Sequence, residues 1–306
     1  MERAEKPNPL MSTLCSVPWV PAHRPIWVWS RWAVSVLIIA ALLLGRESRA
    51  QTASESRLAL VIGNASYKNS PLTKPVNDAR LLESALKDAG FQVIKVENAT
   101  ILEMRRLLRE FGDRLKASGG VGLFYFAGHG VQVHGENFLV SVDSDTRNED
   151  DVADHAVNAQ VVFEAMHSAG NRINLIVLDA FGKNPFAVQS RPGLNGLATM
   201  NALPGTLVAY ASAPGLVASD SAGASSLYAR HLADAMRQPG LQVEEAFKKV
   251  RAAVRHDSKN QQTPWEITAL DGSFYFRPPQ QPTATVALVP GVSAAPLPVP
   301  SRQSPA

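Results

Sequence analysis

The stretch VGLFYFAGHG, residues 121–130, decides the fold class of this chain. It is a continuous apolar run that ends in two glycines on either side of a histidine. A second run of this kind is NRINLIVLDA, residues 171–180. A strand with one wet face alternates apolar and polar residues, whereas these runs do not alternate. Both faces of each strand are therefore expected to be buried, as in a parallel sheet covered by helices.

Segments with helical periodicity alternate with these strands. Residues 75–90, PVNDARLLESALKDAG, carry an apolar stripe, with Pro75 and Asp78 suited to the first turn and Gly90 to the stop. The alternation predicts an α/β fold in which helices sandwich a central, mostly parallel sheet. The expected strands are 57–64, 91–98, 121–130, 137–143, 171–180, 206–215 and 272–278, and the expected helices are 75–90, 100–115, 157–170, 226–238 and 242–256.

The two ends of the chain differ from this pattern. Residues 1–50 combine arginines, an apolar run over residues 32–44 and the small-residue pattern Ser48-Arg49-Ala50. This order predicts a signal peptide that is cut before Gln51, and therefore a periplasmic or secreted protein. Met11 is an alternative start of translation. The alternative to a signal peptide is an uncleaved membrane anchor. Residues 51–56 form a short linker and 57–277 the folded domain. Residues 278–306, rich in Pro and Ala, are expected to form a disordered tail.

Charge and cysteine content exclude several function classes. Residues 1–50 hold six of the 30 basic and three of the 27 acidic residues, so the remainder holds 24 of each and gives no argument for a nucleic-acid partner. The single cysteine, Cys15, lies in the leader, which leaves the mature chain without a thiol. His129 and His134 have no third ligand at a suitable spacing. We expect no metal, no cofactor, and contact with a membrane only through an uncleaved leader.

The ends of the parallel strands are where chemistry is expected, because ligands collect beyond the carboxyl ends of such strands. His129 follows one buried strand and is flanked by a glycine on each side. The glycines leave the imidazole accessible, which suits a general base. The alternative is a histidine that only forms a hydrogen bond within its loop. Asp179 ends the next strand, and Phe181 follows it. Tyr67 and Asn77 flank the first crossover connection. They either line the cleft or have structural roles, in core packing or in helix capping.

Six pieces of the sequence resemble the caspase-like cysteine peptidases (clan CD, family C14), and most closely the bacterial proteins near metacaspases. The resemblance covers about residues 57–277 and implies the caspase-hemoglobinase fold, with a central six-stranded sheet. The pieces are RLALVIGNASY, LTKPVNDARLLESALKDAGFQV, FYFAGHGVQV, NFLVSVD, LIVLDAFGKNPF and AYASAPGLVASD.

The resemblance implies a catalytic histidine at His129 and a nucleophilic cysteine two residues after Asp179, where this chain has Phe181. A phenyl ring has no lone pair with which to attack a carbonyl, so cysteine chemistry is lost at this position. The resemblance also implies that Asp179 and Asp220 receive a basic side chain of a peptide. A capping role for Asp179 and a solvated Asp220 are the alternatives.

Three hypotheses follow. The first is a pseudoprotease that binds a peptide or protein ligand, with a basic side chain, without cleaving it. The second is an active endopeptidase with a nucleophile other than cysteine, for which Ser212 and Ser219 are the nearest candidates. The third is a structural scaffold in which the proline-rich tail holds the partner.

Overall fold

The computed structural model describes residues 55–146, 149–181, 196–216 and 223–280. The chain divides into two units, residues 1–54 and 55–306. The predicted leader and residues 281–306 of the tail therefore lie outside the described residues. Within the described ranges, no helix combines the length and apolar character needed to cross a membrane.

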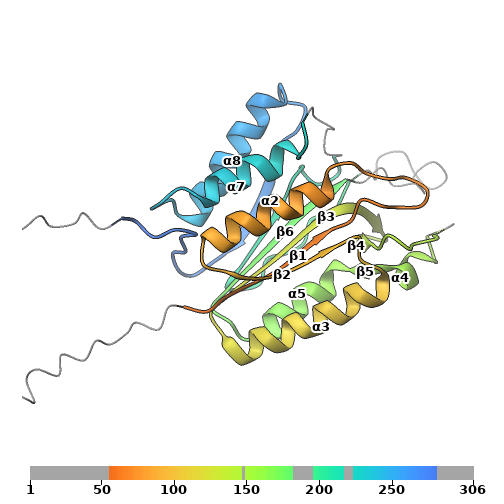
Figure 1. Cartoon of the computed structure of the whole chain (residues 1–306), viewed down its shortest axis with the longest axis horizontal. Helices are drawn as coiled ribbons and strands as arrows, with labels where there is room; N and C mark the ends of the chain where they lie inside the picture. Colours follow the sequence, from red (N-terminus) through yellow and green to blue (C-terminus); the bar gives the residue numbers. More distant parts are fainter. Residues whose placement is uncertain (1–54, 147–148, 182–195, 217–222, 281–306) are drawn as a thin grey trace, which may run out of the picture. The chain divides into compact units, whose positions relative to one another are not determined.

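Six strands form the main path of the sheet, and five of them run parallel (Figure 1). Only the last strand is antiparallel to its neighbour. Two further short strands, β4 (Glu136–Val140) and β5 (Ala156–Asn158), extend the sheet as antiparallel additions to the end of β3. The order of the main path is β2 (Gln92–Glu97), β1 (Arg57–Gly63), β3 (Val121–Val133), β6 (Ile173–Phe181), β7 (Thr206–Tyr210) and β8 (Trp265–Ala269).

Helices cover both faces of this sheet, as the unbroken apolar strands predict. In β3, Tyr125 and Ala127 pack in the core on one face, and Phe124 and Phe126 pack in the core on the other. Figure 1 shows the two helical layers on opposite sides of the strands. The first layer holds α2 (Pro75–Asp88), α7 (Leu227–Met236) and α8 (Val243–Asp257), and the second holds α3 (Ile101–Ser118) and α5 (Ala159–Ser168), with the short α4 (Val152–His155) beside β5.

Two sequence-based assignments are wrong. Residues 272–278 form no strand of the sheet; Phe274 and Phe276 are buried in the core, but the Phe274 carbonyl accepts a hydrogen bond from the N–H of Val243 at the start of α8. Alternating burial imitates a strand there, and the true last strand is β8. The helix expected from residue 157 begins at residue 159, because Asn158 belongs to β5 and caps α5 by accepting from the Gln160 N–H at 2.8 Å.

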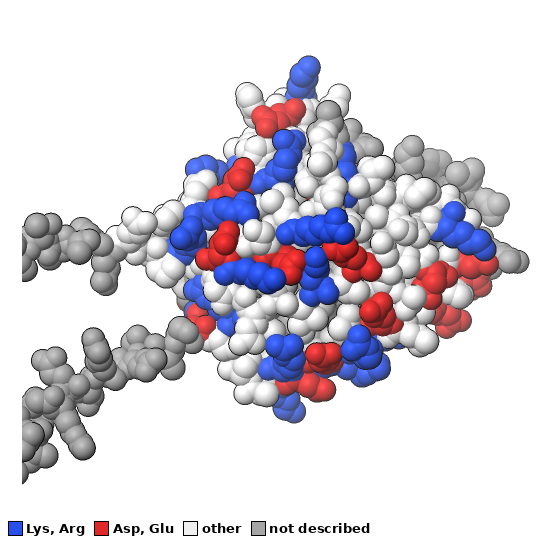
Figure 2. Space-filling view, viewed as in Figure 1, with Lys and Arg blue, Asp and Glu red and all other residues white. Residues whose placement is uncertain are grey.

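Charged side chains of both signs are interspersed on the face shown in Figure 2. Ion pairs join α2 to the edge strand β2, among them Arg80–Glu97 at 2.7 Å and Lys95–Glu83 at 2.9 Å. The described residues of this face therefore present mixed charge rather than the single-signed surface typical of nucleic-acid binding.

Candidate functional site

The pairing of β3 with β6 places two of the predicted site residues side by side. The Cα of His129 is paired with that of Phe181, and Ala127 is paired with Asp179. Neighbouring strands lie about 4.8 Å apart. The two positions that the resemblance assigns to a catalytic dyad are therefore neighbours at the carboxyl end of the sheet.

Tyr67 holds the backbone and ring of His129. The Tyr67 hydroxyl accepts a hydrogen bond from the His129 N–H at 2.8 Å and donates one to the Val140 carbonyl at 3.1 Å. The two rings lie 4.5 Å apart, and the imidazole Nε2 lies 2.7 Å from the carbonyl oxygen of Ser70. A Cβ at Gly128 would meet the Tyr67 hydroxyl at 2.4 Å, so only glycine allows this approach.

A second feature is a buried pair of carboxylates, Asp179 and Asp78. Asp179 Oδ2 accepts hydrogen bonds from the Tyr125 hydroxyl at 3.0 Å and from Ser226 Oγ at 2.9 Å. Asp78 Oδ1 accepts from the backbone N–H of Ser226 at 2.8 Å. Ser226 at the start of α7 thus joins an acid on α2 to an acid on β6, and both acids are fully buried.

Burial makes both acids hold their protons more tightly than usual. Burial, followed by the negative charge of Asp78, raises the pKa of Asp179 to about 7. Burial raises the pKa of Asp78 to about 6, and hydrogen bonds from Ser226 offset part of that rise. The positive charge of Lys74 lowers the pKa of both acids, but by less than burial raises them.

Three polar atoms in this cluster have no hydrogen-bond partner among the described residues. They are Asp179 Oδ1, Asp78 Oδ2 and the hydroxyl oxygen of Tyr228. Buried polar groups are nearly always paired, so these three atoms have hydrogen-bonding capacity that the described residues do not use. A guanidinium, with five N–H donors, or an ammonium group has the charge and hydrogen-bonding capacity that such a cluster lacks.

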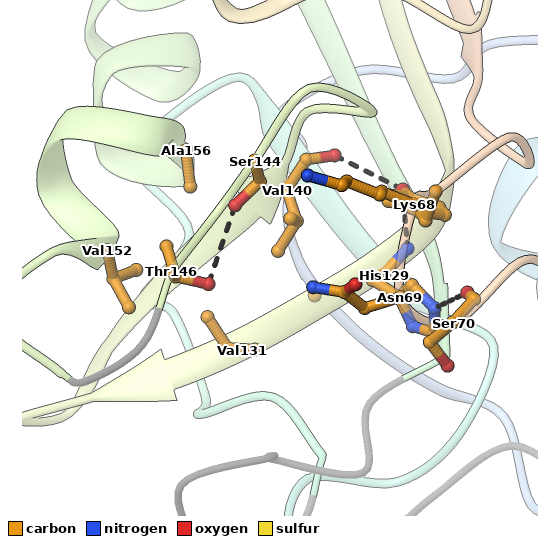
Figure 3. Close-up of a pocket in the computed structure, with 12 residues that line it drawn as sticks. Lys68, Asn69, Ser70, His129, Val131, Val140, Ser144, Thr146, Val152 and Ala156 are labelled. Atoms are coloured by element: carbon orange, nitrogen blue, oxygen red, sulfur yellow. Dashed lines mark hydrogen bonds between the residues drawn. The ribbon is translucent and has the colours of Figure 1, made fainter.

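A third feature is a cavity of about 270 Å³ beside His129. Val131, Val140, Val152 and Ala156 give it an apolar wall (Figure 3). Polar side chains from the loop after β1 and from the segment after β4 form the rest of its lining; they include Lys68, Asn69, Ser70, Ser144 and Thr146. The cavity adjoins the imidazole and suits an aliphatic group.

The remaining predicted residues have varied outcomes. Asp220 and Ser219 lie outside the described residues, so the predicted pairing of Asp179 with Asp220 stays a prediction. Ser212 Oγ is buried without a hydrogen-bond partner among the described residues and is therefore not bonded to His129. Asn77 donates to the Ala224 carbonyl at 3.0 Å.

Asp78 is the site residue that the sequence interpretation missed, because its place in a helix first turn already has a local explanation. The signal that points to it is its position in the first turn of α2, the helix that follows β1 in the chain. His134 occupies the turn between β3 and β4 with a φ of 51°. No group of three His, Cys, Asp or Glu side chains that suits a metal ion occurs among the described residues.

Known proteins share this architecture. The solved structure of the Drosophila initiator caspase Dronc superposes with a TM-score of 0.51 at 18% identity, over 72% of this chain and 85% of that one. This likeness concerns the fold alone. "Mucosa-associated lymphoid tissue lymphoma translocation protein 1" of Homo sapiens is 31% identical over 130 residues, which are 42% of this chain and 15% of that protein.

The Mus musculus homolog of that protein is 30% identical over 135 residues, 44% of this chain and 16% of the homolog. This chain thus matches only a small part of the length of either relative. The caspase domain model (Peptidase_C14) matches residues 56–275, which is most of this chain. The chain therefore belongs to the caspase domain family.

Proposed function

We propose that this chain binds a peptide or protein segment through a basic side chain and does not cleave it by cysteine chemistry. The observation that carries the proposal is the register of β3 and β6, in which His129 is paired with Phe181. In this proposal Phe181 occupies the position of the family's nucleophile. The only cysteine of the chain is Cys15, far away in sequence within the predicted leader.

The acidic pair supports binding of a basic side chain. Asp179 and Asp78 bring two carboxyl groups together, and among the described residues Lys74 is the cation whose charge lowers the pKa of both. The cluster therefore has the capacity for a second cation. Binding of a guanidinium would ionise both acids and would provide partners for Asp179 Oδ1 and Asp78 Oδ2.

The other two hypotheses have less support. An active hydrolase needs a nucleophile activated by His129, and the hydroxyl of Ser212 makes no such hydrogen bond. A scaffold that acts through residues 278–306 would leave the acidic pair without a use. The leader pattern supports our placement of the protein in the periplasm or outside the cell.

The test is peptide binding by fluorescence anisotropy at pH 8. A labelled peptide with a central Arg is compared with the same peptide carrying Gln. We expect at least tenfold tighter binding of the Arg peptide by the wild type, loss of this preference in Asp179→Asn, and no loss in Asp113→Asn, which removes an exposed acid on α3. Mass spectrometry should find the peptide intact.

Equal affinity for the Arg and Gln peptides in the wild type would contradict the binding role. Cleavage of the Arg peptide that His129→Ala abolishes would contradict the absence of catalysis.

A further inference from the structure

The cavity beside His129 has an apolar wall that belongs to a small hydrophobic cluster of its own. Val131, Val152 and Ala156 are buried in this cluster, which is separate from the cores on the two faces of the sheet. Val140 packs against the cluster and completes the wall. The cavity volume of about 270 Å³ equals roughly nine water molecules at about 30 Å³ each. The cavity therefore has room for a ligand of the size of one amino acid, whose aliphatic part would leave water on binding.

Two polar side chains at the rim offer N–H donors to this cavity. Lys68 and Asn69 are exposed, and the side chain of neither forms a hydrogen bond or an ion pair with any other described residue. Figure 3 shows both side chains extended along the cavity, with their nitrogen atoms toward the side that carries Ser144 and Thr146. An ammonium group and an amide N–H next to each other suit the two oxygens of a carboxylate.

The lining offers little to a positively charged group. It contains no Asp or Glu among the described residues. The Val140 carbonyl already accepts hydrogen bonds from Asn64 Nδ2 and from the Tyr67 hydroxyl, each at 3.1 Å. The Ser70 carbonyl oxygen lies 2.7 Å from His129 Nε2. A free amino acid, which carries an ammonium group beside its carboxylate, therefore fits this cavity poorly.

We infer that this cavity binds a branched aliphatic group through its carboxylate, in a ligand that has no charged amine next to that carboxylate. The aliphatic group lies against the apolar wall, and Lys68 and Asn69 bind the carboxylate. Two sources supply this chemistry, a free branched short-chain acid and the C-terminal Val or Leu of a peptide. The inference goes beyond the proposed function and does not depend on it, since neither Asp78 nor Asp179 lines this cavity.

The experiment compares a carboxylate with its neutral amide for each source. A labelled peptide that ends in Gly-Leu and contains no Arg or Lys is measured by fluorescence anisotropy as the free acid and as the C-terminal amide. Isovalerate and isovaleramide are measured by isothermal titration calorimetry. We expect the acid of at least one source to bind about fivefold tighter than its amide, as for an exposed ion pair. Replacing that Leu with Gly, or isovalerate with acetate, should weaken binding at least tenfold, because apolar carbons are no longer buried.

Matched variants assign the carboxylate preference to the rim of this cavity. Lys68→Gln should abolish the preference and Lys68→Arg should keep it, whereas Lys116→Gln, which removes an exposed charge on α3, should leave it unchanged. Asn69→Asp, which puts a negative charge at the rim without changing the size of the side chain, should reverse the preference in favour of the amide. Circular dichroism checks that each variant is folded.

One further variant tests the apolar wall. Val140→Thr replaces a methyl group with a hydroxyl of similar size. It should weaken binding of the branched ligand about fourfold, the effect of about one buried carbon, and should leave the ligand with Gly or acetate unchanged.

The outcomes test this inference separately from the proposed function. An acid preference in one source alone supports the inference and identifies the ligand. Equal binding of acid and amide in both sources overturns it, and so does an acid preference that survives both Lys68→Gln and Asn69→Asp. Because none of these ligands carries a basic side chain, the preference for Arg that tests the proposed function can fail or hold without changing these results.

Discussion

The acidic pair predicts an unusual dependence of stability on pH. In the folded protein Asp179 has a pKa of about 7, against an ordinary value of 3.8. The folded state therefore keeps a proton that the unfolded chain releases. The contribution of Asp179 to stability is most favourable below pH 3.8 and declines as the pH rises to about 7. Replacing Asp179 with Asn removes this decline.

The magnitude follows from the difference in pKa. A rise of about 3 corresponds to about 4 kcal/mol at pH 8, because one pKa unit is about 1.4 kcal/mol. Asp78 and Lys74 share the electrostatics of the site, so we expect about 2 to 4 kcal/mol. At pH 4 the free energy of unfolding of Asp179→Asn should equal that of the wild type or be slightly lower. At pH 8 it should exceed that of the wild type by about 2 to 4 kcal/mol.

Urea unfolding of both proteins at half-unit steps from pH 4 to pH 8 measures the difference directly. Asp113→Asn is the control, because Asp113 is exposed and its replacement should give a difference that does not vary with pH. A free-energy difference between Asp179→Asn and the wild type that is constant over this range, or that falls with pH, would refute the reasoning.

Two further substitutions test the packing around the site. Ser226→Ala removes both the cap of α7 and a hydrogen bond to Asp179. Urea titrations should show a free energy of unfolding lower by about 2 kcal/mol. A loss below about 0.5 kcal/mol would contradict both roles. Gly63→Ala puts a Cβ at 2.5 Å from the Pro75 carbonyl oxygen and 2.7 Å from the Ala79 Cβ. It should lower the free energy of unfolding by about 1–3 kcal/mol. An unchanged midpoint of thermal unfolding would show that α2 packs less closely on β1.

Much of the fold is predictable from the sequence, because burial on both faces leaves a direct pattern. The run at 121–130 has no charged residue before His129 and no alternation of apolar and polar residues, and this is why a covered parallel sheet is the expected structure. His129 and Asp179 are expected at one edge for the same reason, since parallel strands end together. Burial alone, however, does not specify pairing. Phe274 and Phe276 therefore imitate a strand, while the half-exposed β8 escapes notice.

The acidic pair is harder to predict, because it depends on how α2 and α7 pack on β6. Asp78 and Asp179 are far apart in the sequence, and each has a sufficient local explanation, as a helix first-turn acid and as a strand-end acid. Their approach is brought about by Ser226, which lies at the start of a third element. The cavity beside His129 likewise combines the loop after β1, the β3–β4 hairpin and the segment around α4.

Hydrolysis of a fluorogenic Arg peptide by the wild type and by Phe181→Cys, each with Cys15→Ser to exclude the leader thiol, tests the central claim most directly. We predict no turnover by the wild type and measurable turnover by Phe181→Cys, because His129 and the acidic pair are retained and only the thiolate is missing. Adding His129→Ala to Phe181→Cys should abolish this turnover. Turnover by the wild type that depends on His129 would contradict the account.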